Sequence, residues 1–523
     1  MGAAGATHSG PHPHRRCLSP DPAHRRQDRE RDRDPERIGC LQMSGKVRRA
    51  GAIALALSLA GCVSGPDYRV PVDAVAAAPQ AGRAFVSGQD PAFALAEPPQ
   101  RWWQLYDDPE LDAYVAEALQ ANTDLRTADA NLRRASATVL QYRAQGALHT
   151  DASASATLAH AGGYTSPSSP PQVYALGIGL SYPLDLAGGI RRGIEAASAD
   201  AQAVAAARDH VRVVVAAAVT RAYLGTCSAN LTLAATQRVL ETQRATLDAT
   251  RRLAAGGRGT EFDVSRAQAA VDRSAAAIPH LVAERQAALF ELAALMGRLP
   301  ADYPQDARRC QQPPRLQRAI PVGDGWQLIQ RRPDIRAAER NLAAATATIG
   351  VETANLYPQV SIGASAGMAN SLGKLLSGDS FGATLGPLLS WRWPNRRVAK
   401  ARIDAAGADA DAALASFDGA VLQALRQTET ALSAYAQEID RERSLAQARD
   451  AAARASGQAG RLYRFGRIGF LDVLAAEAAL ADAESALASS RAQLVDRQVD
   501  LFLALGGGWS DTGPEAGQTA TRR

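Results

Sequence analysis

The sequence predicts a mainly α-helical chain that is duplicated in tandem and that carries a membrane β-barrel portion. Three observations lead to this prediction. Two motifs recur at a nearly constant distance along the 523 residues. Long segments rich in alanine and leucine repeat their apolar residues at helical spacing. Each half of the chain also contains two short segments in which large apolar residues alternate with small or polar ones.

The repeated motifs indicate two copies of one unit. The stretches Arg252–Val264 and Arg461–Val473 share a Gly-Arg pair and an Asp-Val pair at the same spacing. Upstream, Asp124–Ala135 is similar to Asp334–Ala345 at almost the same separation. Self-similarity at a fixed distance identifies repeated structural units before any local element is assigned. The expected parts are repeat 1 at residues 101–300, a linker at residues 301–325 and repeat 2 at residues 326–509.

The amino-terminal region has the pattern of an export signal at residues 43–61. Basic residues after Met43 are followed by an apolar core and then by Gly61 and Cys62. This order is that of a secretory signal peptide, which is removed from the mature protein. The last four residues up to Cys62 resemble the lipobox of bacterial lipoproteins, in which the cysteine is lipidated; the alternative is a chance cysteine. Val63 is not the aspartate that retains such lipoproteins in the inner membrane, so delivery to the outer membrane is expected.

Residues 1–42 precede this signal and are predicted to be a disordered leader or a misassigned gene start. The first 61 residues hold 11 of the 58 basic residues and 6 of the 53 acidic ones, so the rest of the chain carries 47 of each. The formal net charge of +5 therefore belongs to the leader and signal. A neutral mature chain does not predict a nucleic-acid partner.

Cysteine and histidine positions do not predict a metal site or a cofactor. The mature chain has Cys62 and two further cysteines, Cys227 and Cys310. A disulfide between these two is possible in an oxidising compartment, but they lie far apart without a cysteine framework, so free thiols are favoured. Four scattered histidines lack metal-ligand spacing. No phosphate-binding loop and no nucleophile with a base is recognisable, so no enzymatic activity is expected.

The mature chain is expected to begin as a tether. Residues 62–100 are rich in proline, alanine and glycine, which predicts a lipid-anchored, extended segment rather than a packed element. Trp102 and Trp103 open the folded part. The run Asp107–Glu110 then has the pattern of a helix start, with a capping residue, a proline in the first turn and an acidic residue near the positive end of the helix dipole. Residues 510–523 are expected to form a disordered tail.

Long helices are predicted to follow. Two segments, roughly 190–254 and 396–461, contain almost no proline, and each would extend on the order of 100 Å. Apolar residues recur at steps of three or four from Leu414 to Ile439, and leucines recur every seven residues from Leu480 to Leu501. Such spacing predicts coiled-coil packing. The many alanines predict neighbours on both sides of each helix, as in a wall of helices.

Each repeat also contains a predicted β-hairpin. Residues 174–182 alternate strictly between large apolar and small residues, which predicts a strand with one apolar face. This strand belongs to a hairpin at about 148–187, and a matching hairpin lies at about 357–393. Strands of about ten residues with aromatic ends suit an outer-membrane barrel; the alternative is a soluble hairpin packed on helices. Four strands leave two open edges, which lipid does not tolerate, so other chains must complete the barrel.

Together these motifs resemble the TolC-like outer-membrane efflux protein family. The resemblance is carried by residues 102–135, by SYPLDLAGGIRR at residues 181–192, by the two turn motifs and by LFLALGGGW at residues 501–509. Within the family, the motifs look like the NodT-type lipoprotein branch that serves resistance–nodulation–division pumps. The match covers nearly the whole mature chain. It implies a homotrimer in which each chain contributes four strands to one twelve-stranded β-barrel above a long periplasmic α-helical barrel.

The resemblance places the two turn motifs at the periplasmic tip, where the helical barrel narrows. Asp472 has the position of the constriction aspartates of the family, and Asp263 is its counterpart in repeat 1. Three such carboxylates around one axis would attract cations. Ala475 stands where a second aspartate can occur, so the aperture is expected to depend on one acidic ring, aided by Glu477. The alternative for either aspartate is a helix cap after a glycine turn.

Other residues of these turns are expected to hold the tip closed by hydrogen bonds or to contact an adaptor protein. The alternative is that they are solvated loop residues. The residues concerned are Gly257, Arg258, Tyr463, Gly466 and Arg467.

The function that the resemblance implies is that of a passive exit duct in the outer membrane of a Gram-negative bacterium. The duct would conduct small molecules, such as drugs and toxic compounds, to the exterior. Its partners would be an inner-membrane resistance–nodulation–division pump and a periplasmic membrane-fusion adaptor. One alternative is the duct of a type I protein secretion system. Another is a lipid-anchored coiled-coil scaffold without a pore, which the alternating strands disfavour.

Overall fold

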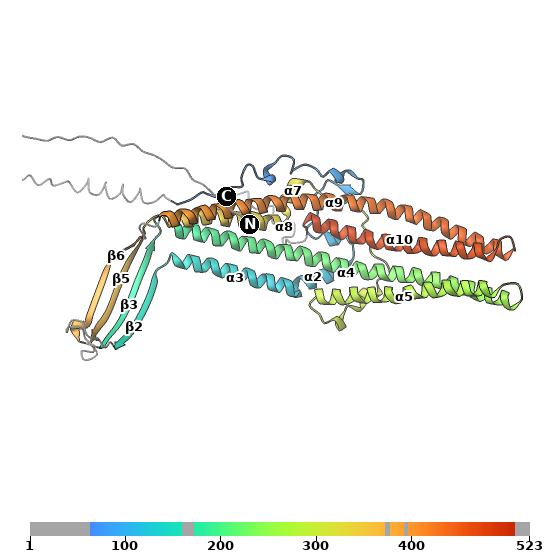
Figure 1. Ribbon diagram of the computed structural model, residues 1–523, viewed down its shortest axis with the longest axis horizontal. Helices are drawn as coiled ribbons and strands as arrows, with labels where there is room; N and C mark the ends of the chain where they lie inside the picture. The colour runs from blue at the N-terminus through green and yellow to red at the C-terminus, as the bar shows by residue number, and fades with distance from the viewer. Residues whose placement is uncertain (1–62, 159–171, 372–376, 392–395, 508–523) are drawn as a thin grey trace, which may run out of the picture. The chain divides into compact units, whose positions relative to one another are not determined.

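The computed structural model describes residues 63–158, 172–371, 377–391 and 396–507, and these fold as two copies of one arrangement (Figure 1). In each copy, two shorter helices, two strands and two longer helices follow one another. The first copy consists of α2 (Pro109–Ala121), α3 (Thr123–Gln145), β2 (His149–Leu158), β3 (Gln172–Leu184), α4 (Gly189–Ala255) and α5 (Glu261–Leu295). The second consists of α7 (Gly325–Arg331), α8 (Pro333–Ala354), β5 (Gln359–Ser371), β6 (Phe381–Ser390), α9 (Arg396–Arg464) and α10 (Phe470–Leu505). The predicted leader, the predicted signal peptide, Cys62 and the predicted tail lie outside the described residues.

The two predicted long helices are confirmed. Helix α4 has 67 residues and α9 has 69, so each extends on the order of 100 Å. Each turns back into the next helix, and the two turns lie at the end of the helices that is remote from the sheet (Figure 1). The apolar seam predicted for α9 is buried at Phe417, Val421 and Leu432, in one cluster with Leu501 of α10. Helix α4 is apolar enough to cross a membrane, but 67% of its most apolar window is buried, as in a core helix.

The two hairpins join into one antiparallel sheet of order β2-β3-β5-β6. The central contact pairs β3 of the first repeat with β5 of the second, for example Leu176 with Met368. On β3, the large residues Leu176, Ile178 and Leu180 are exposed, whereas the small residues between them are less accessible. The predicted alternation is thus confirmed from Leu176 to Tyr182, where it gives the sheet a solvent-exposed apolar face, but it is wrong for Tyr174, which is buried. Within the described residues, β2 and β6 each have only one neighbouring strand.

The predicted helix start and the aromatic pair before it form part of the main core. The side chain of Asp108 caps α2 by accepting hydrogen bonds from the N–H groups of Glu110 and Leu111. Trp102 is fully buried, and its ring stacks on that of Phe502 in α10 at a centroid distance of 4.5 Å. This contact brings the start of the first repeat against the end of the second. The core is therefore shared by both repeats.

The prediction that residues 62–100 form an extended tether is wrong for part of that segment. Residues 74–93 include five buried side chains, among them Phe85 and Phe93, which belong to the main core. Short 3-10 turns bring the backbone N–H groups of Val75 and Val86 to within 2.8 and 2.7 Å of carboxylates on α9. Strand β1 (Phe93–Ala94) pairs in parallel with β4 (Ile320–Pro321) of the linker. The segment lacks apolar periodicity because it packs through turns, so its burial was not predictable from spacing.

The expectation of free thiols is also wrong, because Cys227 and Cys310 form a disulfide with an S–S distance of 2.03 Å. Cys227 lies on α4 and is fully buried. Cys310 follows the short helix α6 (Gln305–Arg309) of the linker, where the side chain of Asn230 on α4 also donates a hydrogen bond to its carbonyl at 2.7 Å. The linker therefore folds back onto α4. Two cysteines separated by 83 residues meet only because of this tertiary contact.

Candidate functional site

The two turns that join the long helices have the same backbone geometry. The N–H of Arg258 donates to the carbonyl five residues earlier at 2.8 Å, and the N–H of Arg467 makes the equivalent bond at 2.9 Å. Each arginine follows a glycine with positive φ, Gly257 at 71° and Gly466 at 69°. Glycine adopts this conformation without strain, and the bond pattern is that of a helix terminus. The Gly-Arg pair of the repeated motif thus ends α4 and α9.

The two aspartates predicted at the constriction lie in the first turns of α5 and α10. Asp472 is exposed, and its Oδ2 accepts a hydrogen bond from the N–H of Gly469 at 3.0 Å. The Oδ2 of Asp263 accepts from the N–H of Thr260 at 3.2 Å and from its hydroxyl at 2.7 Å. Within one chain, both aspartates therefore cap helices. Because Asp472 remains exposed while it caps, its charge is also available to a neighbouring copy.

A small apolar cluster joins the two helical hairpins next to the turns. It contains Leu240 and Leu247 of α4, Val271 of α5 and Phe470 of α10. Tyr463 packs against this cluster, with its ring centroid 5.9 Å from that of Phe470. The structure therefore places Tyr463 in a contact that holds the hairpins together. This cluster is remote from the main core, so few apolar contacts fix the tips.

The arginines of the turns have a different environment. Arg258 and Arg467 are both exposed. Among the residues that the structure describes, neither guanidinium group has an ion-pair or hydrogen-bond partner. Their positions do not support hydrogen bonds that hold the tip closed within one chain. They leave two cationic groups free at the end of the hairpins.

Glu477 lies between helices rather than at the tip surface. Its Oε1 accepts a hydrogen bond from the hydroxyl of Thr246 on α4 at 2.7 Å, and its Oε2 is buried without a donor. Burial raises the pKa of the Glu477 carboxyl, and the hydrogen bond from Thr246 partly opposes this effect. Glu477 lines a groove of about 450 Å³ between α4, α5 and α10, in which Gln243 and Glu484 also have a buried oxygen without a donor. Sequence inspection missed Thr246 and Gln243 because they are single polar residues inside a long helix.

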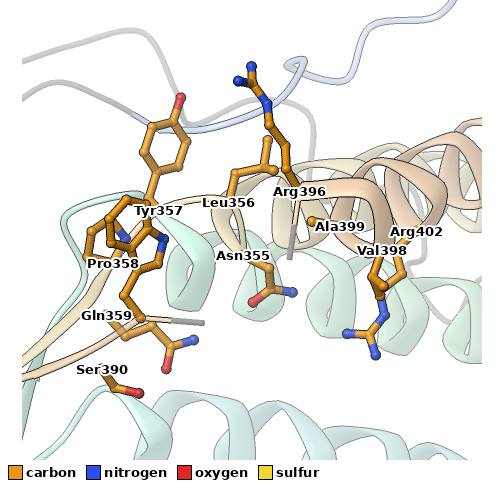
Figure 2. A pocket seen from close by; sticks show the side chains of 11 residues that line it. Asn355, Leu356, Tyr357, Pro358, Gln359, Ser390, Arg396, Val398, Ala399 and Arg402 are labelled. Carbon is orange, nitrogen blue, oxygen red and sulfur yellow. The ribbon is translucent and has the colours of Figure 1, made fainter. Parts of the chain in front are cut away.

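A second depression lies where the sheet meets the helices. Its volume is about 580 Å³, and residues from the α8–β5 connection, the end of β6 and the start of α9 line it. Figure 2 shows Arg396 and Arg402 pointing in different directions, with Tyr357 on the opposite side of the depression. These groups do not converge on one point, as a catalytic site requires. Among the described residues, no cluster of histidine, cysteine or acidic side chains is placed to hold a metal ion.

The exposed apolar face of the sheet and the two long helical hairpins define the class of the protein. They are the parts of a membrane-inserted channel subunit rather than of an enzyme. The chain belongs to the outer membrane efflux protein family, which matches residues 114–298 and 326–507.

Individual relatives agree with this assignment. The chain is 31% identical over 484 residues to the probable efflux pump outer membrane protein TtgC of Pseudomonas putida, covering 89% of this chain and 96% of TtgC. It is 27% identical over 461 residues to nodulation protein T of Rhizobium leguminosarum bv. trifolii, covering 87% of this chain and 96% of that protein. The structure of the outer-membrane channel OprN superimposes with a TM-score of 0.79 at 34% identity, covering 86% of this chain and all of OprN.

The resemblance identified from the sequence motifs is therefore confirmed. The protein is an outer-membrane channel of an efflux system in a Gram-negative bacterium, and its family consists of channels rather than enzymes. Its two copies of the α-β-α unit are the two repeats of that family.

Proposed function

We propose that three copies of this chain form a lipid-anchored exit duct whose periplasmic end is gated at the helical tips. The observation that carries this proposal is the four-stranded sheet with an exposed apolar face and two open edges, β2 and β6. An open edge in lipid leaves backbone groups without hydrogen bonds, so β6 of one copy must pair with β2 of another. Three copies give a closed barrel of twelve strands, a size that encloses a water-filled lumen.

The names of similar proteins support a proposal for the transported compounds, and the family suggests the partners. Proteins similar to this chain are named for the efflux of antibiotics, toluene and solvents. We infer that small, largely apolar toxic molecules leave through this duct. An inner-membrane resistance–nodulation–division pump would supply the energy, and a periplasmic adaptor would connect the two. The exposed guanidinium groups of Arg258 and Arg467 support an adaptor contact at the tips. Lipid attachment would be at Cys62.

Asp472 is proposed to form the gate. Replacing Asp472 by asparagine is expected to weaken block of the channel by multivalent cations at least tenfold, because three negative charges leave the axis. The asparagine oxygen still accepts the hydrogen bond from Gly469, so the helix cap is preserved. Asp472→Ala removes both the charge and the cap, and the lost cap costs about 1 kcal/mol. Conductance of the purified protein in planar bilayers measures both effects.

Two controls sharpen this experiment. Asp306→Asn makes the same charge change on the exposed surface of α6 and should leave cation block unchanged. Asp263→Asn tests whether the repeat 1 counterpart contributes to the constriction. Unchanged block in an assembled Asp472→Asn trimer would remove Asp472 from the gate. If the protein is a folded monomer that conducts no ions, the trimeric duct is contradicted and the coiled-coil scaffold without a pore is favoured.

Glu477 is expected to weaken the contact between the two hairpins when it is ionised. Its pKa in the folded protein is raised above the ordinary value of 4.5 by burial, so stability falls as the pH rises from that value through the folded pKa. Glu477→Gln keeps an acceptor for Thr246 and replaces the buried, unpaired Oε2 by an amide group in a groove where Gln243 and Glu484 each have a buried oxygen without a donor. We expect it to stabilise the tips by about 1–2 kcal/mol at neutral pH.

The gain from Glu477→Gln should disappear in acid, where the native carboxyl is protonated. Thermal unfolding from pH 4 to pH 8 checks this dependence. Glu291→Gln on the exposed surface of α5 is the matched control, for which no pH-dependent difference is expected. If the melting temperatures of Glu477→Gln and of the native protein depend on pH in the same way, the charge of Glu477 does not destabilise the contact between the two hairpins.

A further inference from the structure

We propose that buried Arg192 clamps the first residues of the mature chain and thereby positions its lipid-bearing end at the boundary between sheet and helices. This inference rests on the proposed lipid attachment at Cys62. Arg192 is a positioning residue on the first turn of α4, and it is only 3% exposed. The segment that it binds, Val63–Asp67, directly follows Cys62 in the sequence.

The guanidinium group of Arg192 binds this segment through several hydrogen bonds. Its Nε donates to the carbonyl of Ser64 at 3.0 Å, and its Nη2 donates to the carbonyl of Gly65 at 3.2 Å and to the carboxylate of Asp67 at 2.7 Å. Its Nη1 donates to Glu195 on the same helix at 2.7 Å. A buried charge is tolerated only when it is paired and hydrogen-bonded. Three of the four groups that satisfy Arg192 come from the amino-terminal segment.

Glycines allow the segment to approach the helices this closely. A Cβ added at Gly65, whose φ is 82°, would lie 2.4 Å from the Cα of Gly350 on α8. A Cβ added at Gly350 would lie 2.7 Å from both the Ser64 carbonyl and the Arg192 side chain. The N–H of Ser64 also donates to the carbonyl of Ala187, just before α4, at 3.0 Å. The segment is therefore held between the first repeat, through α4, and the second, through α8.

The clamp lies where the strands become helices. Strand β3 ends at Leu184 and α4 begins five residues later at Gly189. Gly350 lies near the end of α8, shortly before β5 begins. From there the chain runs along the helices. The hydroxyl of Tyr68 donates a hydrogen bond to the carboxylate of Glu339 on α8 at 3.2 Å, and the backbone N–H of Val75 donates to the carboxylate of Asp418 on α9. The first described residues, beginning at Val63, thus lie where the strands meet the helices. In the proposed barrel, this boundary is the periplasmic surface of the outer membrane.

The occupant of this position is the acylated amino-terminal cysteine of the same chain. One residue spans at most about 3.6 Å, and Cys62 directly precedes the clamped segment. The chain between an acylated Cys62 in the membrane and the clamp would therefore be too short to move freely. The lipid would therefore fix the depth of α4 and α8 directly, instead of holding the channel on a loose tether. The exposed aromatic residues at the same boundary, Tyr357 and Trp391, suit a membrane surface.

Amide hydrogen exchange of Ser64, Gly65 and Asp67, the residues of the 64–67 segment that have an amide hydrogen, tests the clamp in the detergent-solubilised, full-length trimer. Arg192→Ala is expected to raise exchange of these amides at least tenfold. Arg192→Lys should rescue only partly, because one ammonium group cannot reproduce the planar guanidinium contacts. Arg191→Ala is the matched control, since Arg191 is exposed and pairs with Asp185 outside the segment. It should leave exchange of residues 64–67 unchanged.

A second variant keeps the test decisive if Arg192→Ala does not fold. Gly350→Ala leaves every charge in place and favours the helix, yet its Cβ must displace the Ser64 carbonyl, so exchange should again rise. Native exchange rates in residues 64–67 of an assembled Arg192→Ala or Gly350→Ala trimer would overturn the clamp.

The mass of the amino-terminal peptide separates this inference from the lipid attachment. If Cys62 is acylated but amide exchange of the residues that follow it does not depend on Arg192, the clamp is wrong and the lipid attachment is supported. An unmodified Cys62, with exchange that still depends on Arg192, would overturn the anchor and support the clamp as a site for the amino-terminal segment.

Discussion

Replacing Cys227 and Cys310 by alanine is expected to lower the free energy of unfolding by about 4–5 kcal/mol, since the disulfide closes a loop across 83 residues. A cross-link removes conformational freedom from the unfolded chain, and this effect grows slowly with loop length. The closed loop contains the end of α4, the first tip and all of α5. The disulfide therefore ties the linker to the wall of helices and limits how far the first hairpin can separate from it.

Thermal unfolding of the protein, produced in an oxidising compartment and measured with and without a reductant, gives this difference. The double alanine variant should melt at the temperature of the reduced protein and should not respond to the reductant. The single variant Cys310→Ala should lose as much as the double variant. If complete reduction, verified by thiol labelling, leaves the melting temperature unchanged, the disulfide does not stabilise the channel.

Replacing Arg332 by alanine is expected to cost about 3–5 kcal/mol, because it removes a buried guanidinium group together with its ion pair to the partly buried Asp334 and its hydrogen bonds to two further helices. Arg332 precedes α8 and is 5% exposed. Its Nη1 donates to the carbonyl of Ala504 at the end of α10 at 2.7 Å, and its Nη2 donates to Asp334 at 2.7 Å and to Gln427 of α9 at 2.9 Å. One side chain thus joins three helices at the level of the main core.

The pH dependence of stability provides a second measurement on this variant. Burial alone would raise the pKa of Asp334, but the hydrogen bonds and charge of Arg332 hold it below the ordinary value of 3.8. A lowered folded pKa gives stability that is present above the ordinary value and is lost as the pH falls below it. Arg332→Ala should lose this acid dependence. Arg309→Ala breaks an exposed ion pair and should cost less than about 1 kcal/mol.

Several elements were predictable because their signals are local. The seam from Leu414 to Ile439 predicted a buried face of α9, since helical periodicity depends only on neighbours within a few turns. The alternation at residues 174–182 predicted the exposed apolar face of β3 for the same reason. The repeated Gly-Arg and Asp-Val pairs predicted two equivalent turns, because glycine with positive φ and a first-turn acid are local requirements of helix ends.

The candidate site was predictable only in part. The sequence located Asp263 and Asp472 in the turns, and the structure shows both as helix caps, so their proposed gating role depends on neighbouring copies. The position of Glu477 against Thr246 was not predictable, because it results from packing between hairpins that are remote in the sequence. The clamp of Arg192 on Ser64 joins residues 128 positions apart and left no local pattern.

The duplication, the long helices, the alternating strands and the family were readable from the amino-acid sequence, because repeats and periodicity are properties of neighbouring residues. The folded chain was needed to show that Cys227 and Cys310 form a disulfide, how the amino-terminal segment packs and which strands pair at the centre of the sheet. Those contacts depend on surfaces that exist only after the two repeats have folded against each other.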